Sequence, residues 1–359
     1  MASVQNSKGI AAPLGISKPL LRWYDRHARE LPWRISPADR KKGMQPDPYR
    51  VWLSEIMLQQ TTVATVTPRY QRFLDLWPTL SDLASARQEE VLAEWAGLGY
   101  YARAHNLHKC AQVLQQDHDG LFPETAQGLL ALPGIGPYTA AAIAAISFDE
   151  PAPVMDGNIE RVMARLYAVE TPLPDAKPVL RAYAAQETPV KRPGDHAQAL
   201  MDVGATICTP RKPVCSLCPL SQFCGAQSRG IAADLPRKKK KADKPTRHGT
   251  AFVIRRKSDN HVLLVRRAPK GLLGGMLAPP TTDWRTEKSI DPSPPFRANW
   301  QSQNKVVRHT FTHFHLVLEV QETIVATHAK LDLEGEWVAD PLTAGLPTVF
   351  RKIFLPSGG

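Results

Sequence analysis

The amino-acid sequence predicts a multidomain protein in which a helical domain is followed by a smaller α/β domain. Residues 18–227 contain alanine- and leucine-rich stretches of helical periodicity, interrupted by Pro and Gly. From Thr250 onward, short runs of Val, Ile and Leu separated by turn residues are typical of strands. Four clustered cysteines near the end of the helical part indicate a metal centre there. A chain of 359 residues has room for two or three domains.

The domain boundaries follow from shifts in composition. The run from Arg237 to Lys241 is basic and poor in apolar residues, so it either lies along phosphates or keeps a linker solvated. We therefore expect a disordered N-terminal segment at 1–17, the helical domain at 18–227, a basic linker at 228–247 and the α/β domain at 248–356.

Charge and hydropathy limit the function classes. The net charge is +11 and the pI is about 9.5, which suits an acidic partner such as nucleic acid but is also compatible with an ordinary basic surface. The first thirty residues lack the long apolar core of a secretory signal, and no apolar run approaches the length needed to span a bilayer. We expect no membrane association and a cytoplasmic location.

The first candidate catalytic residue is Glu55. Asp47-Pro48 is a helix start, because Asp is a preferred N-cap and Pro fits the first turn. On the helix that follows, Glu55 is surrounded by apolar residues, so it lies either on a narrow solvent face or in the interior. If it is buried, loss of hydration raises its pKa, which suits a general acid.

A glycine-containing turn follows further along the chain. The segment Leu132-Pro133-Gly134-Ile135-Gly136-Pro137-Tyr138 lies between an apolar stretch and an alanine-rich helix from Thr139 to Ile146. Glycines allow a tight turn with exposed N–H groups, and the helix adds the positive end of its dipole. The pattern resembles a helix-hairpin-helix, which holds a DNA backbone without reading its sequence.

The second candidate carboxylate is Asp156, which the sequence places as the N-cap of a helix that continues through Leu166. A helix N-terminus stabilises an anion, so we expect Asp156 to stay ionised where Glu55 is protonated. A neutral acid and a fixed anion suit the cleavage of a glycosidic bond through an oxocarbenium-like transition state. The sequence alone does not show that the two residues meet.

The cysteines Cys208, Cys215, Cys218 and Cys224 have the spacing C-x6-C-x2-C-x5-C. Four thiolates joined by short loops can bind a [4Fe–4S] cluster or a structural zinc ion. The spacing lacks the paired C-x2-C knuckles of a zinc ribbon, which favours iron–sulfur. Two disulfides are the alternative to a metal centre.

Short apolar runs define the α/β domain. Ala251–Ile254 and Val262–Val265 are predicted strands joined by a turn at Asp259-Asn260, and Phe314–Val320 is a third predicted strand. Residues 279–302 are rich in Pro and polar groups and are predicted to form a loop.

Taken together, these motifs closely resemble the MutY-type adenine DNA glycosylases of the endonuclease III superfamily. The resemblance covers roughly residues 18–227 and continues more weakly to the C-terminus. It implies an all-α helix-hairpin-helix domain with one [4Fe–4S] cluster and a C-terminal Nudix-like domain. A six-helix module would span about 47–150, and an iron–sulfur module 18–46 and 151–227. The matching segments are Leu31 to Arg34, Trp52 to Thr61, Gly97 to Tyr101, Leu132 to Tyr138, Met155 to Asn158 and the four cysteines.

The resemblance implies an activity, the removal of adenine mispaired with 8-oxoguanine or guanine after the base is flipped out of the duplex. It assigns Glu55 to protonation of adenine N7 and activation of water, and Asp156 to stabilisation of the cationic sugar. The supporting residues that it implies are Tyr138 and Asn158 beside the carboxylates, and Arg29, Trp33 and Gln198 in the adenine pocket.

The resemblance also implies a DNA interface. Gln60 and Tyr100 match positions that enter the base stack near the damaged guanine.

Glycosylase/lyases of the superfamily carry a Lys where this chain has Tyr138, so we expect a monofunctional enzyme. We expect a monomer, associated with the nucleoid in a bacterium, that binds double-stranded DNA containing A:8-oxoguanine or A:G through Gly134, Gly136, Gln60, Thr61, Leu98 and Tyr100.

The C-terminal domain resembles a Nudix domain that lacks the metal-binding glutamates, which argues against pyrophosphohydrolase activity. By resemblance it recognises 8-oxoguanine through a loop that reads Phe311-Thr312-His313 here, where the family has Phe-Ser-His.

The segment from Ile35 to Gln45 is longer than usual for this family, and the sequence assigns it no role.

Overall fold

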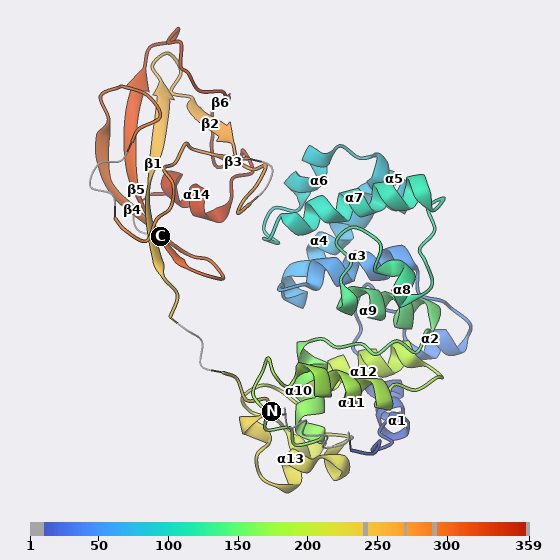
Figure 1. Ribbon diagram of the computed structural model, residues 1–359. Helices are drawn as coiled ribbons and strands as arrows, with labels where there is room; N and C mark the ends of the chain where they lie inside the picture. The colour runs from blue at the N-terminus through green and yellow to red at the C-terminus, as the bar shows by residue number, and fades with distance from the viewer. Residues whose placement is uncertain (1–10, 240–242, 269–270, 289–292, 357–359) are drawn as a thin grey trace, which may run out of the picture. The chain divides into compact units, whose positions relative to one another are not determined.

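The computed structural model describes residues 11–239, 243–268, 271–288 and 293–356. The chain divides into two compact units, Met1–Lys240 and Lys241–Gly359 (Figure 1). The first unit is helical and the second contains the sheet. Within the described residues, none of the helices has both the length and the apolar character needed to cross a bilayer.

The first unit consists of α-helices and short 3-10 helices joined by loops. Its α-helices are α1 (Ser17–His27), α2 (Pro37–Lys41), α3 (Pro48–Leu58), α4 (Val63–Leu76), α5 (Leu80–Ser85), α6 (Gln88–Glu94), α7 (Ala102–Asp117), α8 (Ala126–Leu129), α9 (Pro137–Phe148), α10 (Gly157–Leu166), α11 (Lys177–Glu187), α12 (Pro193–Thr206) and α13 (Gly225–Ser228). Its 3-10 helices are η1 (Cys215–Leu217), η2 (Ser221–Phe223) and η3 (Ala232–Asp234).

Side-chain caps set the helix starts that matter for the site. Asp47 accepts a hydrogen bond from the Tyr49 N–H and caps α3, which begins at Pro48 as predicted. Asp156 accepts from the Ile159 N–H and caps α10, which ends at Leu166 as predicted. Gly136 occupies the N-cap position of α9, and Pro137 occupies its first turn.

Two groups of helices form the helical unit: α3 to α9 lie in one module, and α1 lies with α10 to α13 in the other (Figure 1). The two modules come into close contact where α9 meets α12. A Cβ at Gly194 would lie 2.4 Å from the Ala145 carbonyl oxygen, so a residue without a side chain is needed there. The chain passes between the modules through residues 28–47 and 149–156.

The prediction of disorder through residue 17 is wrong for residues 11–17, which are ordered; residues 1–10 lie outside the described residues. Ile16 is fully buried, and the carboxylate of Glu187 accepts hydrogen bonds from the N–H groups of Leu14 and Ile16. Ser17 begins α1. The anchoring partner lies about 170 positions away in the sequence, so local composition gave no sign of it.

The predicted basic linker is partly folded onto the helical unit. Leu235 is buried, Arg237 forms an ion pair with Glu170, and Lys239 forms one with Asp175. These two cations of the run are therefore engaged by carboxylates, whereas Lys240 and Lys241 lie outside the described residues.

The second unit is built on a mixed sheet of strand order β3-β2-β1-β5-β4, with β6 pairing with β2. Strands β1 and β5 are parallel, starting at Thr246 opposite His315, and β4 is antiparallel to β5. The helix α14 contributes Val349, Phe350 and Ile353 to the main core. The elements are β1 (Thr246–Arg256), β2 (Val262–Arg266), β3 (Leu277–Ala278), β4 (Gln301–Thr310), β5 (His315–Val325), β6 (Glu336–Val338) and α14 (Thr348–Phe354).

Candidate active site

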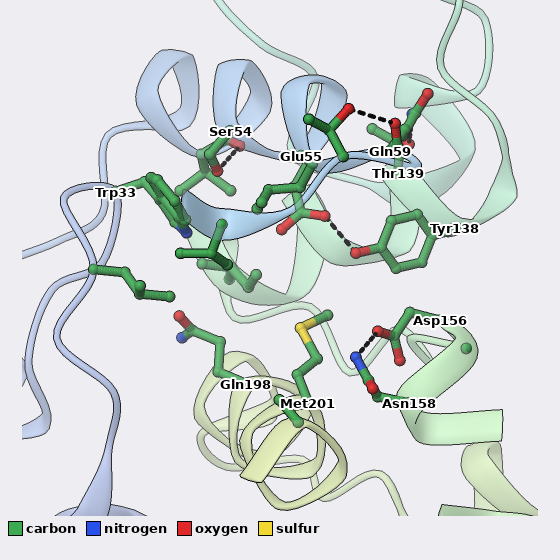
Figure 2. A pocket seen from close by; sticks show the side chains of 18 of the residues that line it. Trp33, Ser54, Glu55, Gln59, Tyr138, Thr139, Asp156, Asn158, Gln198 and Met201 are labelled. Carbon is green, nitrogen blue, oxygen red and sulfur yellow. Dashed lines mark hydrogen bonds between the residues drawn. The ribbon is translucent and has the colours of Figure 1, made fainter. Parts of the chain in front are cut away.

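A cavity of about 840 Å³ lies between the two helical modules (Figure 2). Its size falls in the range of small-molecule pockets, and its walls mix apolar and polar side chains. Residues from α3 and α9 line one side, and residues from α10 and α12 line the other. The lining includes Arg29, Trp33, Arg34, Ser54, Glu55, Gln60, Thr61, Gly134, Gly136, Tyr138, Asp156, Asn158, Gln198 and Met201.

Glu55 is buried on α3, which excludes the solvent-face alternative that the sequence left open. Its Oε2 accepts a 2.5 Å hydrogen bond from the Tyr138 hydroxyl. Burial raises the pKa of Glu55 to about 7, and the Asp156 charge adds to the rise, whereas the Tyr138 hydrogen bond and Arg34 oppose it. Near neutral pH this carboxyl can therefore both donate and accept a proton.

Asp156 faces the same cavity from the start of α10 (Figure 2). It accepts hydrogen bonds from the Ile159 N–H at 2.7 Å and from Asn158 Nδ2 at 2.8 Å. These donors favour the anion, but burial outweighs them and raises the pKa of Asp156 above its ordinary value. This burial opposes the expectation that the helix N-terminus keeps Asp156 ionised, because the residue is largely shielded from water.

The side chain of Asn158 is itself held in place by a hydrogen bond from Arg161. Arg161 donates to Asn158 Oδ1 at 2.9 Å and to the Cys208 carbonyl at 2.7 Å. A Cβ at Gly204 would lie 2.5 Å from the Asn158 Cβ, so α12 approaches α10 closely only because this position is glycine. The Asp156 carboxylate is therefore fixed through a short chain of contacts that reaches the cysteine loop.

The three residues predicted for the base pocket all line the cavity. Trp33 packs edge-on against Tyr70, and Gln198 is buried on α12. Arg29 lies 3.7 Å from Asp202 through its Nη1.

Sequence reasoning missed the ion pair between Arg34 and Asp202, which lies beside the cavity. Arg34 Nη1 lies 2.7 Å from Asp202 Oδ2, and the charge of Arg34 lowers the pKa of Glu55. Arg34 belongs to a motif that was recognised, and Asp202 lies one helical turn after Gln198, so the spacing on α12 was an available signal.

The predicted DNA-facing residues are grouped around three tight turns, at Gln60-Thr61, Leu98 to Tyr100 and Gly134 to Gly136. Gln60 and Tyr100 both have left-handed backbone conformations, with φ of 59° and 49°, and the Tyr100 side chain is exposed. Gly134 has a φ of 75°, and a Cβ there would lie 2.6 Å from the Asn106 Cβ. Leu98 is different: its side chain is buried in the helical core, so a direct DNA contact by this side chain is not supported.

The four cysteines are all free thiols, so the alternative of two disulfides is wrong. They line one small cavity, and Arg165 Nη1 donates to the Cys208 sulfur at 3.2 Å, which suits an anionic thiolate. Among the described residues, no group of three or more His, Cys, Asp or Glu side chains is arranged to hold a single metal ion. The four cysteines that line this cavity are the donor set that an iron–sulfur cluster uses.

In the second unit, the predicted recognition residues form the turn between β4 and β5. Phe311 donates its N–H to the Phe314 carbonyl, and its ring stacks on Trp284. Thr312 and His313 are exposed at the tip of this turn. Phe311 is therefore a turn residue anchored in the core.

Family models match three parts of the chain. Residues 53–184 match the HhH-GPD superfamily base excision DNA repair proteins, residues 208–224 match the iron–sulfur binding domain of endonuclease III, and residues 250–355 match a NUDIX domain. The cysteine loop thus carries a [4Fe–4S] cluster, and the second unit is Nudix-like.

Named relatives agree with these matches. An adenine DNA glycosylase of Buchnera aphidicola subsp. Acyrthosiphon pisum is 31% identical over 360 residues, covering 94% of this chain and 96% of its own. The human adenine DNA glycosylase is 44% identical over 226 residues, covering 62% of this chain. The matches span 41% of the length of the human protein and 58% of that of the Arabidopsis thaliana relative.

A solved structure shares the helical fold. A thermostable thymine-DNA glycosylase superposes with a TM-score of 0.51 and 29% identity, covering 59% of this chain and 94% of its own.

Proposed function

The chain belongs to the adenine DNA glycosylase family, and we propose that it excises adenine paired with 8-oxoguanine or guanine by hydrolysing the N-glycosidic bond. The observation that carries the proposal is that Glu55 and Asp156 face one cavity from two modules, and that the Tyr138 hydroxyl donates a hydrogen bond to Glu55. A flipped nucleoside needs such a pocket, and two carboxylates in different environments suit cleavage of a glycosidic bond.

In this proposal, protonated Glu55 donates its proton to adenine N7. The C1′–N9 bond then breaks, and its electron pair leaves with the neutral base. Water attacks C1′ of the resulting oxocarbenium ion, and the Glu55 carboxylate accepts the proton that water releases. The raised pKa of Glu55, about 7, lets one residue serve in both steps at neutral pH.

Asp156 stabilises the cationic sugar through its negative charge. Asn158 and the Ile159 N–H hold the carboxylate in one orientation, and Arg161 holds Asn158. Tyr138 orients Glu55 by donating its hydroxyl hydrogen. Because a phenol cannot form a Schiff base as a lysine amine would, the enzyme is monofunctional and leaves an abasic site.

Cys208, Cys215, Cys218 and Cys224 are the proposed ligands of the cluster. When bound, the cluster joins four sulfurs and so fixes the loop between them. Arg211 and Lys212 are exposed on this loop, where they can contact phosphates. Trp33, Gln198 and Arg29 surround the base, whereas Gln60 and Tyr100 enter the stack opposite it.

The test is incubation of the full chain with duplexes that contain A opposite 8-oxoguanine, G or T, followed by alkali. We expect strand scission only after alkali, and only in the first two duplexes. Glu55→Gln should lower the single-turnover rate at least about 100-fold with DNA binding retained. Glu89→Gln changes an exposed glutamate and should react like the parent. Equal rates for Glu55→Gln and the parent would refute the proposal.

A further inference from the structure

The segment from Ile35 to Gln45, to which the sequence assigned no role, contains α2 at the junction of the two helical modules. It belongs to one of the two chain crossings between the modules, residues 28–47. The other crossing, residues 149–156, begins where α9 ends and delivers Asp156 to the cavity. A side-chain contact that joins the two crossings therefore restrains residues 149–156, and so restrains the position of Asp156 relative to Glu55.

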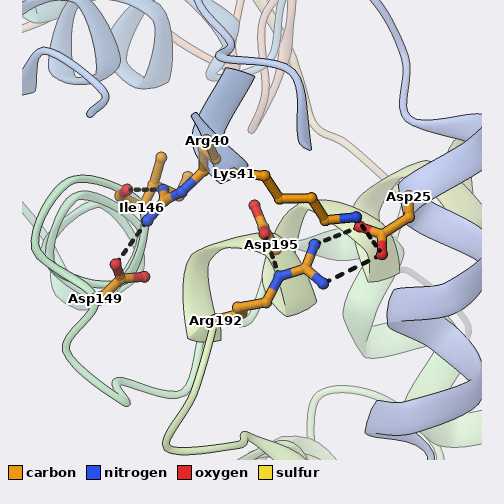
Figure 3. Close-up of polar contacts among 7 residues, drawn as sticks. All are labelled: Asp25, Arg40, Lys41, Ile146, Asp149, Arg192 and Asp195. Atoms are coloured by element: carbon orange, nitrogen blue, oxygen red, sulfur yellow. Dashed lines mark hydrogen bonds and ion pairs between the residues drawn. The ribbon is translucent and has the colours of Figure 1, made fainter. Parts of the chain in front are cut away.

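Arg40 makes such a connection (Figure 3). Its Nη1 donates to the Ile146 carbonyl at 3.0 Å, and its Nη2 lies 2.6 Å from Asp149 Oδ2. The Arg40 side chain is only 11% exposed. Asp149 is the C-cap of α9 in a left-handed conformation, and Ile146 lines the cavity. One planar guanidinium thus holds both the carboxyl end of α9 and the first residue of the crossing.

The next residue of α2 points toward the other module (Figure 3). Lys41 Nζ lies 3.2 Å from Asp25 Oδ2 on α1, and Asp25 also pairs with Arg192 at 2.6 Å. Arg192 in turn pairs with Asp195 at 2.7 Å, in the first turn of α12. Consecutive side chains of α2 therefore bind the end of α9 on one side and Asp25 of α1 on the other, and Arg192 links Asp25 to the first turn of α12.

The contact of α2 with α9 lies beside the close contact between α9 and α12. Gly194 on α12 packs against Ala145 and Ile146 on α9, and the Ile146 carbonyl is an acceptor for Arg40. A small rotation at this point would move α12 and the 149–156 crossing relative to α3. Misplacement of a reacting group by about 1 Å can cost about 100-fold in rate.

We propose that α2 is a clasp and that Arg40 is a positioning residue, which fixes Asp156 opposite Glu55 by joining the two crossings between the modules. The proposal rests on the proposed glycosylase function for its effect on rate. Its structural part, the restraint of residues 149–156 by Arg40, stands without that function.

The test compares Arg40→Ala, Arg40→Lys, Asp149→Asn and the double variant Arg40→Ala/Asp149→Asn in the full chain. We expect Arg40→Ala to lower the single-turnover excision rate about tenfold to 100-fold with unchanged affinity for the duplex. Arg40→Lys, which can reach one acceptor, should recover part of the rate. The double variant should react no more slowly than Arg40→Ala, because both changes remove the same contact.

Hydrogen exchange of the DNA-free protein gives the second readout. Amides at the end of α9 and in residues 149–156 should exchange faster in Arg40→Ala than in the parent. The control is Lys42→Ala, since Lys42 is exposed and pairs with Asp39 three residues earlier, and it should match the parent in both assays. The proposed role of α2 would be refuted if these amides exchanged at the parental rate in Arg40→Ala. It would also be refuted if Lys42→Ala changed exchange and excision as much as Arg40→Ala does. If the parent released no adenine, the glycosylase proposal would fail and exchange alone would decide.

Discussion

At the scale of single residues, Glu55 shows where sequence reasoning stops. The helix around it was predictable, because Asp47-Pro48 begins it and apolar residues follow. Whether Glu55 faced solvent was not predictable, because the residues that enclose it come from α9 and α12, about 80 to 140 positions later. Burial is what raises its pKa to about 7, so the key property of the site depends on tertiary packing.

The pH dependence of excision should report the protonation state of Glu55. The acid must be protonated to act, so the single-turnover rate should fall as pH rises through about 7. The Tyr138 hydroxyl hydrogen bonds to the Glu55 carboxylate and lowers its pKa. Tyr138→Phe removes that donor, so the falling limb should move to higher pH by about one pH unit. The measurement is a single-turnover rate profile from pH 5 to 9.

A matched control for this profile is Tyr49→Phe, which removes a buried hydroxyl of α3 that donates to the Trp77 carbonyl. In Tyr49→Phe the excision rate should fall over the same pH range as in the parent. A Tyr138→Phe limb that moved to lower pH would contradict the role of the Tyr138 hydrogen bond.

At the scale of elements, local signals located helix starts but not the segments whose partners are distant. Both helices with Asp caps began where predicted, and the first strands and their turn were found at the right positions. The anchored segment 11–17 and the helix α2 were missed. Segment 11–17 is held by Glu187, more than 100 positions away, and no local pattern encodes that contact. Helix α2 did carry a local signal, because Ser36 caps it and Pro37 occupies its first turn, but its contact with Asp149 is also more than 100 positions away.

The turns that present Gln60 and Tyr100 share one support, Arg103 on α7. Its guanidinium donates to the carbonyls of Ile56 and Leu98 at 2.8 and 2.7 Å, and also to the carbonyls of Met57 and Gly99 and the Thr61 hydroxyl. A lysine amine cannot reach this set of acceptors. Arg103→Lys should therefore lower the free energy of unfolding of the helical unit by about 2–3 kcal/mol and weaken duplex binding.

Urea unfolding and a binding titration with duplex DNA measure the two effects. Arg72→Lys is the control, because Arg72 forms an exposed ion pair with Glu94. It should leave both stability and binding near the parental values. Parental stability in Arg103→Lys would show that the turns around Gln60 and Tyr100 do not depend on this guanidinium.

At the scale of the whole molecule, the order of the domains was readable from composition, and their detailed boundaries were not. The basic run at 237–241 suggested a free linker, but Arg237 and Lys239 pair with Glu170 and Asp175 of the helical unit. Ion pairs between residues that meet only after folding cannot be predicted from the distribution of charged residues along the sequence. The proposed division of labour, chemistry in the helical unit and lesion recognition in the Nudix-like unit, follows from the family and is open to a direct test.

Thr312 and His313 provide that test, because both are exposed at the turn between β4 and β5 while Phe311 anchors the turn in the core. If this turn contacts 8-oxoguanine, Thr312→Ala or His313→Ala should reduce the preference for A:8-oxoguanine over A:G by about tenfold, the value of one or two hydrogen bonds. Excision from A:G should stay near the parental rate, since the cavity with Glu55 lies in the other unit. His328→Ala removes an exposed histidine beyond the opposite end of β5 and should leave the preference unchanged. Unchanged preference in both turn variants would remove the turn from lesion recognition and leave the proposed adenine chemistry intact.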